Sequence, residues 1–273
     1  MNKVINMNII ADTKIIFIDI DRTLTNSDKE VSDKTKEVIK QIEEKGIKVI
    51  LCTGRWNLYA AQKSKEISAT PITISNSGNL VFNYETNEII YINEIIKEHL
   101  VDVFNYCNEH NFDCAMNGIM KRFVNTNSIR EGQVITNVSE VDEPISELNI
   151  KMNSLDEAIA FKAYIDSDQY LGRGFMSESI INYDPNSDNY EFDVFVKGAG
   201  KGDGIKALLA KLNIPVSQTM CFGDYINDYS MFQECDIKVA MDNGTEKLKQ
   251  LADYVTLTND TDGVAAFLEE TLL

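Results

Sequence analysis

FIDIDRTLT, residues 17–25, places two carboxylates at the end of a strongly apolar segment. The run Ile15–Ile18 leads directly into Asp19, and Asp21 follows two positions later. An unpaired carboxylate is costly to bury, and two unit charges at about 4 Å repel each other by roughly 4 kcal/mol at an effective dielectric of about 20. The stretch therefore indicates either a polar loop that begins where a buried strand ends, or a site in which a cation holds the acids.

The residues around this stretch predict alternating strands and helices. Residues 14–19 form an expected strand that is apolar on both faces, which is typical of a parallel sheet covered on both sides. A helix at 33–45, a strand at 47–52, a helix at about 56–66 and a short strand at 71–74 are expected to follow. This order predicts an α/β fold with a doubly wound, mostly parallel, Rossmann-like sheet and right-handed crossovers.

The middle of the chain has a different pattern. Short strand-like pieces at 121–124 and 148–152 alternate with helical pieces at 94–108 and 155–166. This mixture predicts an inserted α+β domain, which we place at residues 84–190.

The α/β alternation resumes at residue 191. We predict strands at 191–196, 219–222, 237–241 and 254–256, and helices at 205–212, from about 227, at 244–251 and at about 263–270. The core domain is therefore expected to be discontinuous, with residues 1–83 and 191–273 on either side of the insert.

The net charge restricts the possible partners. The 273 residues carry a formal net charge of −17 and are 44% hydrophobic, which is ordinary for a globular protein with a sizeable core. Nucleic acids and anionic membranes bind basic surfaces, so we expect neither as a partner. The same field repels phosphorylated metabolites, so a substrate of that kind would need cations within its site.

Further sequence features indicate a cytoplasmic protein. Its five cysteines form no CxxC pair, which favours reduced thiols over a zinc module or a disulfide framework. No segment approaches the roughly 20 apolar residues that span a bilayer, and residues 1–14 lack a continuous apolar stretch of signal-peptide length. His99 and His110 are expected on polar, exposed helix faces.

Polar residues gather at the expected ends of the core strands. Asp19 and Asp21 end the first strand, Thr53 ends the second, and Asp224 ends a later one, while Lys201 opens a helix. Sites in open α/β sheets lie outside the carboxyl ends of the strands. Residues two apart in an extended chain face the same way, about 6.6 Å apart. These groups are therefore predicted to share one cleft.

The chain resembles the phosphatases of the haloacid dehalogenase superfamily, in the Cof-like branch. The resemblance covers nearly the whole chain, most weakly in the insert. It rests mainly on the DxDxT and GDxxND elements, since Thr53 or Lys201 alone carries little weight. The matching stretches are DIDRTL at 19–24, TGR at 53–55, KG at 201–202, GDYIND at 223–228, VAMDNG at 239–244, ADYVT at 252–256 and DGVA at 262–265.

Three positions depart from the family pattern. Arg22 stands where the family usually has Gly after the second Asp, and it adds a cation near the mouth of the site. Asp242 precedes Asn243 where Gly is usual, and residues 76–78 match the usual Asn-Gly-Ala only loosely. None of these changes removes a group that the resemblance implies to be catalytic.

The resemblance implies a covalent phosphoaspartate mechanism. Asp19 would attack phosphorus, and Asp21 would protonate the leaving oxygen and then activate water. The implied cofactor is Mg²⁺, held by the Asp19 carboxylate, the Asp21 backbone carbonyl and Asp224, with Asp228 outside or bridged by water. The implied phosphate- and substrate-binding residues are Thr53, Gly54, Arg55, Lys201 and Asn227.

The insert resembles a C2-type cap that would close over the cleft and select the leaving group. A small phosphorylated metabolite is the expected substrate, with a sugar phosphate ahead of pyridoxal phosphate and flavin mononucleotide. Lys121 and Arg122 are candidate substrate contacts. The sequence does not determine the oligomeric state.

Other functions are open at this point. A phosphomutase would return the phosphoryl group to the sugar, and a receiver-like module would hold phosphate on an Asp without needing Asp21 or the insert. Residues 197–204, KGAGKGDG, fail as a nucleotide loop. Gly202 stands where a P-loop has Ser or Thr, and Asp203 where the dinucleotide fingerprint has Gly.

Several of the candidate residues also have plain structural interpretations. Thr53 could be a helix N-cap, Lys201 a solvated lysine in a Gly-rich turn, and Asn243 a turn residue. Asp228 could cap the first turn of its helix, and Arg55 could form a salt bridge with the insert.

Overall fold

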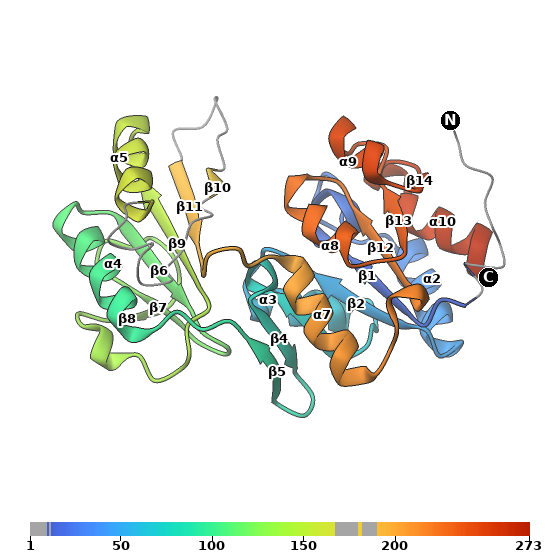
Figure 1. Cartoon of the computed structure of the whole chain (residues 1–273), viewed down its shortest axis with the longest axis horizontal. Helices are drawn as coiled ribbons and strands as arrows, with labels where there is room; N and C mark the ends of the chain where they lie inside the picture. Colours follow the sequence, from blue (N-terminus) through green and yellow to red (C-terminus); the bar gives the residue numbers. More distant parts are fainter. Residues whose placement is uncertain (1–9, 11, 167–179, 182–189) are drawn as a thin grey trace. The chain divides into compact units, whose positions relative to one another are not determined.

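The computed structural model describes residues 10, 12–166, 180–181 and 190–273 (Figure 1). The chain divides into two compact units. The first contains Met1–Tyr91 and Gly200–Leu273, and the second is Ile92–Ala199. The first unit is thus built from both ends of the chain, as the resumed α/β alternation predicted.

An eight-stranded sheet forms the centre of the first unit, in the order β14-β13-β12-β1-β2-β3-β4-β5. The six strands from β14 to β3 pair in parallel, and β4 is antiparallel to β3. The strands are β1 (Ile15–Ile18), β2 (Lys48–Cys52), β3 (Ile72–Ser75), β4 (Leu80–Asn83), β5 (Glu88–Ile92), β12 (Thr219–Gly223), β13 (Ile237–Ala240) and β14 (Tyr254–Val255).

Helices cover both faces of this sheet. Ile16 and Ile18 of β1 pack in one cluster with apolar residues of α2 and α10, whereas Ile15 and Phe17 pack in another with residues of α7, α8 and α9. This alternation is why β1 is apolar at every position. The predicted doubly wound fold is confirmed. The helices are α2 (Asp33–Glu44), α3 (Asn57–Glu66), α7 (Lys201–Leu212), α8 (Tyr229–Gln233), α9 (Glu246–Leu251) and α10 (Gly263–Leu272).

Helix α2 shows how local sequence sets these boundaries. The Ser32 side chain accepts a hydrogen bond from Thr35 N at its start, and Val38, Ile39 and Ile42 form its buried face. Gly46 follows its last turn with a φ of 81°, a left-handed conformation in which glycine carries no Cβ penalty.

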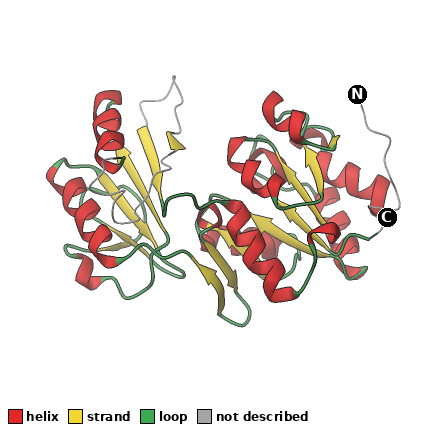
Figure 2. Cartoon of the chain, viewed as in Figure 1, coloured by secondary structure: helices red, strands yellow, loops and turns green. Residues whose placement is uncertain are grey.

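The second unit is an α+β domain with a six-stranded sheet in the order β10-β11-β9-β6-β7-β8 (Figure 2). All its strand pairs are antiparallel except β7 with β8. The elements are α4 (Lys97–Glu109), β6 (Asp113–Asn117), β7 (Arg122–Val124), β8 (Gln133–Val134), β9 (Glu147–Met152), α5 (Leu155–Ile165), β10 (Ile180–Ile181) and β11 (Tyr190–Val194).

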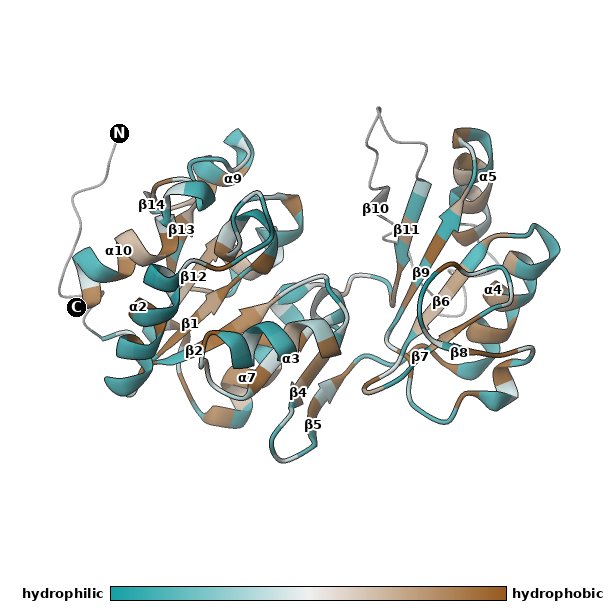
Figure 3. Cartoon of the chain, turned by 180° about the vertical axis from the view of Figure 1, so that it is seen from behind, coloured by the Kyte–Doolittle hydropathy of each residue, from teal (hydrophilic) through white to brown (hydrophobic). Residues whose placement is uncertain are grey.

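One face of this second sheet is apolar and packs against its two helices. Met116, Ile150 and Phe192 share a buried cluster with residues of α4 and α5. Alternate positions carry polar side chains, and Asn149 links Asn117 to Asp193 through hydrogen bonds of 2.7 Å each. Figure 3 shows largely apolar strands in the first unit and a mixture of apolar and hydrophilic stretches in β9 and β11 of the second.

The unit boundaries differ from the predicted ones. The structure divides the chain after residues 91 and 199, whereas the sequence predicted divisions after 83 and 190. Two strands account for the difference. β5 extends the first sheet beyond β4. β11, which was expected in the core, pairs antiparallel with β9 of the second sheet. The residue pattern of a segment indicates that it forms a strand, but it does not indicate which sheet the strand joins.

The predicted exposure of the histidines is half correct. His110 is exposed and stacks on Tyr106, with ring centroids 4.0 Å apart. His99 is buried, contrary to the prediction, because it shares the buried face of α4 with Leu100, Val103 and other residues. Within the described residues, no helix has the length and apolar composition needed to cross a bilayer.

A loop after β3 lets α7 approach the sheet closely. Asn76, Ser77 and Gly78 all have positive φ. A Cβ on Gly78 would lie 2.2 Å from the carbonyl oxygen of Gly200, the residue that precedes α7. The same loop is tied to the end of β2, since Ser77 N donates to Thr53 O and Asn76 N donates to Arg55 O. Gly78 therefore sets where the first turn of α7 lies.

Replacing Gly78 with Ala should destabilise the first unit more than replacing Gly46. Both glycines have left-handed φ, which costs an L-residue about 1 kcal/mol, but a Cβ on Gly46 meets nothing within 4 Å. Gly78→Ala adds a backbone overlap, so we expect a further loss of about 1–3 kcal/mol. Urea unfolding followed by fluorescence of Trp56, the single tryptophan, measures both. Equal losses would contradict the close approach.

Candidate active site

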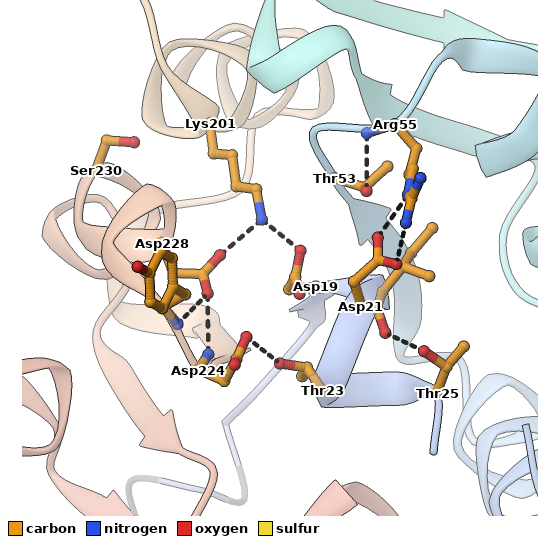
Figure 4. Close-up of polar contacts among 12 residues, drawn as sticks. Asp19, Asp21, Thr23, Thr25, Thr53, Arg55, Lys201, Asp224, Asp228 and Ser230 are labelled. Atoms are coloured by element: carbon orange, nitrogen blue, oxygen red, sulfur yellow. Dashed lines mark hydrogen bonds and ion pairs between the residues drawn. The ribbon is translucent and has the colours of Figure 1, made fainter. Parts of the chain in front are cut away.

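Three buried carboxylates meet where β1 and β12 end (Figure 4). The two strands pair in parallel with Ile18 opposite Phe222, so Asp19 and Asp224 emerge side by side. Asp228 comes from the helical turn Ile226–Asp228 that follows. Ligand atoms of Asp19, Asp224 and Asp228 all lie within 4.8 Å of one another. The predicted gathering of polar groups at the strand ends is thus present for these acids.

Lys201 places its ammonium between two of these acids. Lys201 Nζ lies 2.5 Å from Asp19 Oδ1 and 2.6 Å from Asp228 Oδ1. The side chain is only 2% exposed, so it is not a solvated lysine in a turn. Burial alone would lower the pKa of Lys201, but the negative charges of Asp19 and Asp228 outweigh it and raise that pKa. Lys201 is therefore a charged link between β1 and the turn after β12.

Asp228 also organises the loop that carries Asp224. Its Oδ2 accepts hydrogen bonds from Asp224 N at 2.9 Å and Tyr225 N at 3.1 Å. Gly223 makes room for it, because a Cβ there would lie 2.6 Å from Asp228 Oδ2. The capping interpretation of Asp228 is correct for the short turn Ile226–Asp228 but not for α8, for which Asp228 makes no side-chain cap. Its Oδ2 caps that turn while its Oδ1 binds Lys201.

The acidic cluster is short of positive charge. Burial, reinforced by Asp228, raises the pKa of Asp224 to about 6 even though Arg22 and Lys201 oppose the shift. Burial likewise raises the pKa of Asp19 despite the nearby Lys201. We assign the charge to Lys201, because two carboxylates contact it. Three carboxylates then face one buried ammonium and one exposed guanidinium.

Asp224 keeps one oxygen available for a further cation. Thr23 Oγ1 donates to Asp224 Oδ1 at 3.5 Å, whereas the buried Oδ2 accepts no hydrogen bond. Carboxylate oxygens are the ligands that hard divalent cations prefer. The residues of the cluster therefore fit a divalent metal ion such as Mg²⁺.

Asp21 lies outside this cluster and pairs with Arg55. Arg55 Nε donates to Asp21 Oδ2 at 2.8 Å, and Nη2 donates to Oδ1 at 2.6 Å, the two-point geometry that guanidinium groups favour. The Arg55 guanidinium also lies over the Tyr59 ring, 5.5 Å from its centroid. Arg55 thus pairs with an acid of its own unit, a partner that the sequence did not indicate.

The remaining predicted residues lie around the same strand ends. Thr53 is buried, and its Oγ1 accepts a hydrogen bond from Arg55 N at 3.1 Å. It is not the cap of α3, because that helix begins at Asn57 after Trp56. Gly54 separates Thr53 from Arg55 in this turn, and Asn227 is a half-buried residue of the turn between Asp224 and Asp228.

Arg22 adopts an unusual backbone conformation beside the cluster. Its φ is 62° and ψ is 9°, which costs a non-glycine residue about 1–2 kcal/mol. Its Nε lies 3.3 Å from Asp224 Oδ2, and its Nη2 donates to Asn243 O at 3.3 Å. Asn243 Nδ2 in turn donates to Arg22 O at 2.8 Å. Asn243 is therefore more than a turn residue, since it fixes the Arg22 loop.

The raised pKa of Asp224 predicts a pH-dependent stability of the metal-free protein. The folded protein protonates Asp224 near pH 6 and the unfolded chain near 3.8. The folded state therefore binds more protons between these values, so Asp224 lowers the free energy of unfolding as pH rises through this window. Without metal at pH 7.5, Asp224→Asn should be more stable than wild type by on the order of 1–3 kcal/mol, with the difference vanishing towards pH 4.

Urea unfolding in EDTA across this pH range measures the effect. Asp28→Asn is the matched control, because Asp28 is exposed. A metal-free Asp224→Asn protein that is less stable than wild type at pH 7.5 would contradict the charge imbalance.

Comparisons with known proteins identify the family of the chain. The sequence profile of the haloacid dehalogenase-like hydrolases matches residues 16–268. Phosphatase YwpJ of Bacillus subtilis (strain 168) is 29% identical over 287 aligned residues, which cover 95% of this chain and 100% of the relative. The 5-amino-6-(5-phospho-D-ribitylamino)uracil phosphatase YcsE of the same strain is 24% identical over 266 residues, covering 96% and 97%.

A solved structure supports the same conclusion. The crystal structure of a haloacid dehalogenase-like hydrolase from Bacteroides thetaiotaomicron matches with a TM-score of 0.82 and 25% identity, over 94% of this chain and 99% of that one. The resemblance drawn from the sequence motifs is thereby confirmed. Because the family profile extends from β1 to α10, this chain belongs to the haloacid dehalogenase-like hydrolases.

Proposed function

We propose that this chain is a Mg²⁺-dependent phosphatase that hydrolyses a small phosphorylated metabolite through a phosphoaspartate on Asp19. The observation that carries the proposal is the buried group of Asp19, Asp224 and Asp228, with Lys201 bound to Asp19. Phosphatases among the relatives support the reaction class. A charged ammonium beside a carboxylate nucleophile can neutralise the phosphoryl oxygens as they approach it.

Asp19 is the proposed nucleophile. Lys201 binds its Oδ1, which orients the carboxylate and leaves Oδ2 as the attacking atom. Attack forms the bond from Oδ2 to phosphorus and breaks the ester bond, so the leaving oxygen departs with the electron pair and takes a proton from Asp21. Water then attacks the acyl phosphate, Asp21 accepts its proton, and inorganic phosphate leaves Asp19 free again.

Arg55 is proposed to control when Asp21 exchanges a proton. Both Asp21 oxygens accept hydrogen bonds from Arg55, so a proton on Asp21 would lie beside the guanidinium, and withdrawal of Arg55 from one oxygen would make proton exchange easier. A substrate phosphate or leaving group that attracts the guanidinium would have this effect. Thr53, Gly54 and Asn227, at the ends of β2 and β12, are proposed to bind the phosphoryl oxygens.

Mg²⁺ is the proposed metal because the cluster offers only oxygen ligands and lacks positive charge. Asp19, Asp224 and the backbone carbonyl of Asp21 would hold it, with Asp228 outside or bridged by water. When bound, the ion would supply positive charge to the phosphoryl group. Lys201 and the ion would together bring positive charge to the phosphoryl group in a chain of net charge −17.

A sugar phosphate is the proposed substrate, with the second unit acting as a cap that selects the leaving group. The relative YcsE is named for a substrate phosphorylated on a ribityl chain, which is a sugar alcohol. Lys121 and Arg122 remain candidate contacts on the second unit. Lys121 pairs with Asp142 at 2.5 Å, and Arg122 Nε donates to Asn117 Oδ1 at 2.9 Å.

Phosphate release tests the proposed function. Wild type should release inorganic phosphate from p-nitrophenyl phosphate and from some members of a panel of sugar and sugar-alcohol phosphates in Mg²⁺, and not in EDTA. Asp19→Asn should lower turnover by at least about 10³-fold, because it removes the nucleophile. Asp28→Asn, an exposed change of the same type, should match wild type.

Two outcomes would contradict the proposal. Turnover in Asp19→Asn at the rate of wild type would exclude Asp19 as the nucleophile. Transfer of the phosphoryl group between sugar positions without release of free phosphate would show a mutase instead.

A further inference from the structure

Arg22 is an exposed cation directed at a buried acid. Its side chain is 64% exposed, whereas that of Asp224 is 4% exposed, and Nε lies 3.3 Å from Asp224 Oδ2. That oxygen accepts no hydrogen bond, so the contact with Arg22 is electrostatic and leaves the lone pairs of Oδ2 uncommitted. Arg22 thus compensates part of the charge of Asp224 without satisfying the oxygen that faces it.

Hydrogen bonds at both the main chain and the side chain of Arg22 hold its guanidinium in this position. The main-chain carbonyl of Arg22 accepts from Asn243 Nδ2, and the guanidinium donates to the main-chain carbonyl of Asn243. Asn243 is itself fixed, because its Oδ1 accepts from Asn259 N at 2.9 Å. These contacts keep an arginine in a left-handed conformation that glycine would adopt without penalty. A strained residue persists only where its surroundings hold it there, and the contacts with Asn243 hold Arg22.

A metal ion bound by Asp224 must share that carboxylate with Arg22. Two cations on one carboxylate repel each other, and the repulsion acts on the metal because the contacts with Asn243 hold the arginine in place. The charge of Lys201 also acts on Asp224, but its ammonium contacts Asp19 and Asp228, whereas Arg22 lies within ion-pair distance of Asp224 itself.

We propose that Arg22 is a positioning residue that holds Asp224 while the metal is absent and weakens Mg²⁺ binding by competing for the same carboxylate. This inference rests on the proposed Mg²⁺ site. A partly solvated unit charge close to a bound divalent ion should change its dissociation constant by about tenfold. The site would then release and exchange its metal more readily than the three carboxylates alone would allow.

Titration calorimetry with MgCl₂ alone, without substrate, tests the proposal. Arg22→Gln removes the charge, and Arg22→Gly also removes the backbone strain, so both should bind Mg²⁺ about tenfold more tightly than wild type. Arg22→Lys keeps the charge and should remain within about threefold of wild type. Lys29→Gln is the matched control, because Lys29 is also exposed and has a φ of 63°; it should bind Mg²⁺ as wild type does.

The outcomes separate this inference from the proposed function. If wild type binds Mg²⁺ and both uncharged variants bind it with equal or lower affinity, Arg22 does not compete and the inference is wrong. If all three Arg22 variants, Lys included, gain the same affinity, the cause is the loss of contacts made by the arginine side chain and not the loss of its charge, which also overturns it. If wild type and every variant fail to bind Mg²⁺, the proposed metal site fails and the inference fails with it.

Discussion

The ammonium of Lys201 is the interaction on which the rest of the site depends. Burying three carboxylates within 4.8 Å of one another would cost several kcal/mol for each unpaired charge. Lys201 offsets part of that cost by contacting Asp19 and Asp228 at once. It can do so because Gly78 lets α7 approach the sheet and because β1 and β12 pair in parallel. Burial, followed by the charge of Asp228, raises the pKa values of Asp19 and Asp224, and the proposed metal ion would offset this cost of burying the carboxylates.

Two arginines each lie beside a different acid of the site. Arg55 binds both oxygens of Asp21, and Arg22 faces the oxygen of Asp224 that accepts no hydrogen bond. Asp19, the proposed nucleophile, is contacted by neither and is oriented by Lys201. The proposed reaction needs each acid in a different state: one attacking, one exchanging a proton and one binding metal. Each of these three acids lies beside a different cation, and this difference in charge environment allows the three states to differ.

The sequence predicted the first unit and its buried acids well, and for identifiable reasons. Strand β1 is apolar on both faces because helices cover both, and the acids follow it because the site lies at the strand ends. The assignment of β5 and β11 could not be predicted, since strand patterns do not specify a partner. His99 was placed wrongly because it lies on the buried side of α4 beside Leu100. The pairing of Arg55 with Asp21 depends on side-chain directions that the sequence spacing leaves undetermined.

Trapping the intermediate tests the central claim most directly. Wild type should be mixed with Mg²⁺ and a substrate that it hydrolyses, and the reaction should be quenched in acid within one turnover. The protein should then be digested and its peptides mapped by mass spectrometry. The account predicts a phosphoryl group on the peptide that contains Asp19, at the end of β1, and none in Asp19→Asn. Phosphorylation on a different residue, with none on the peptide that contains Asp19, would contradict it.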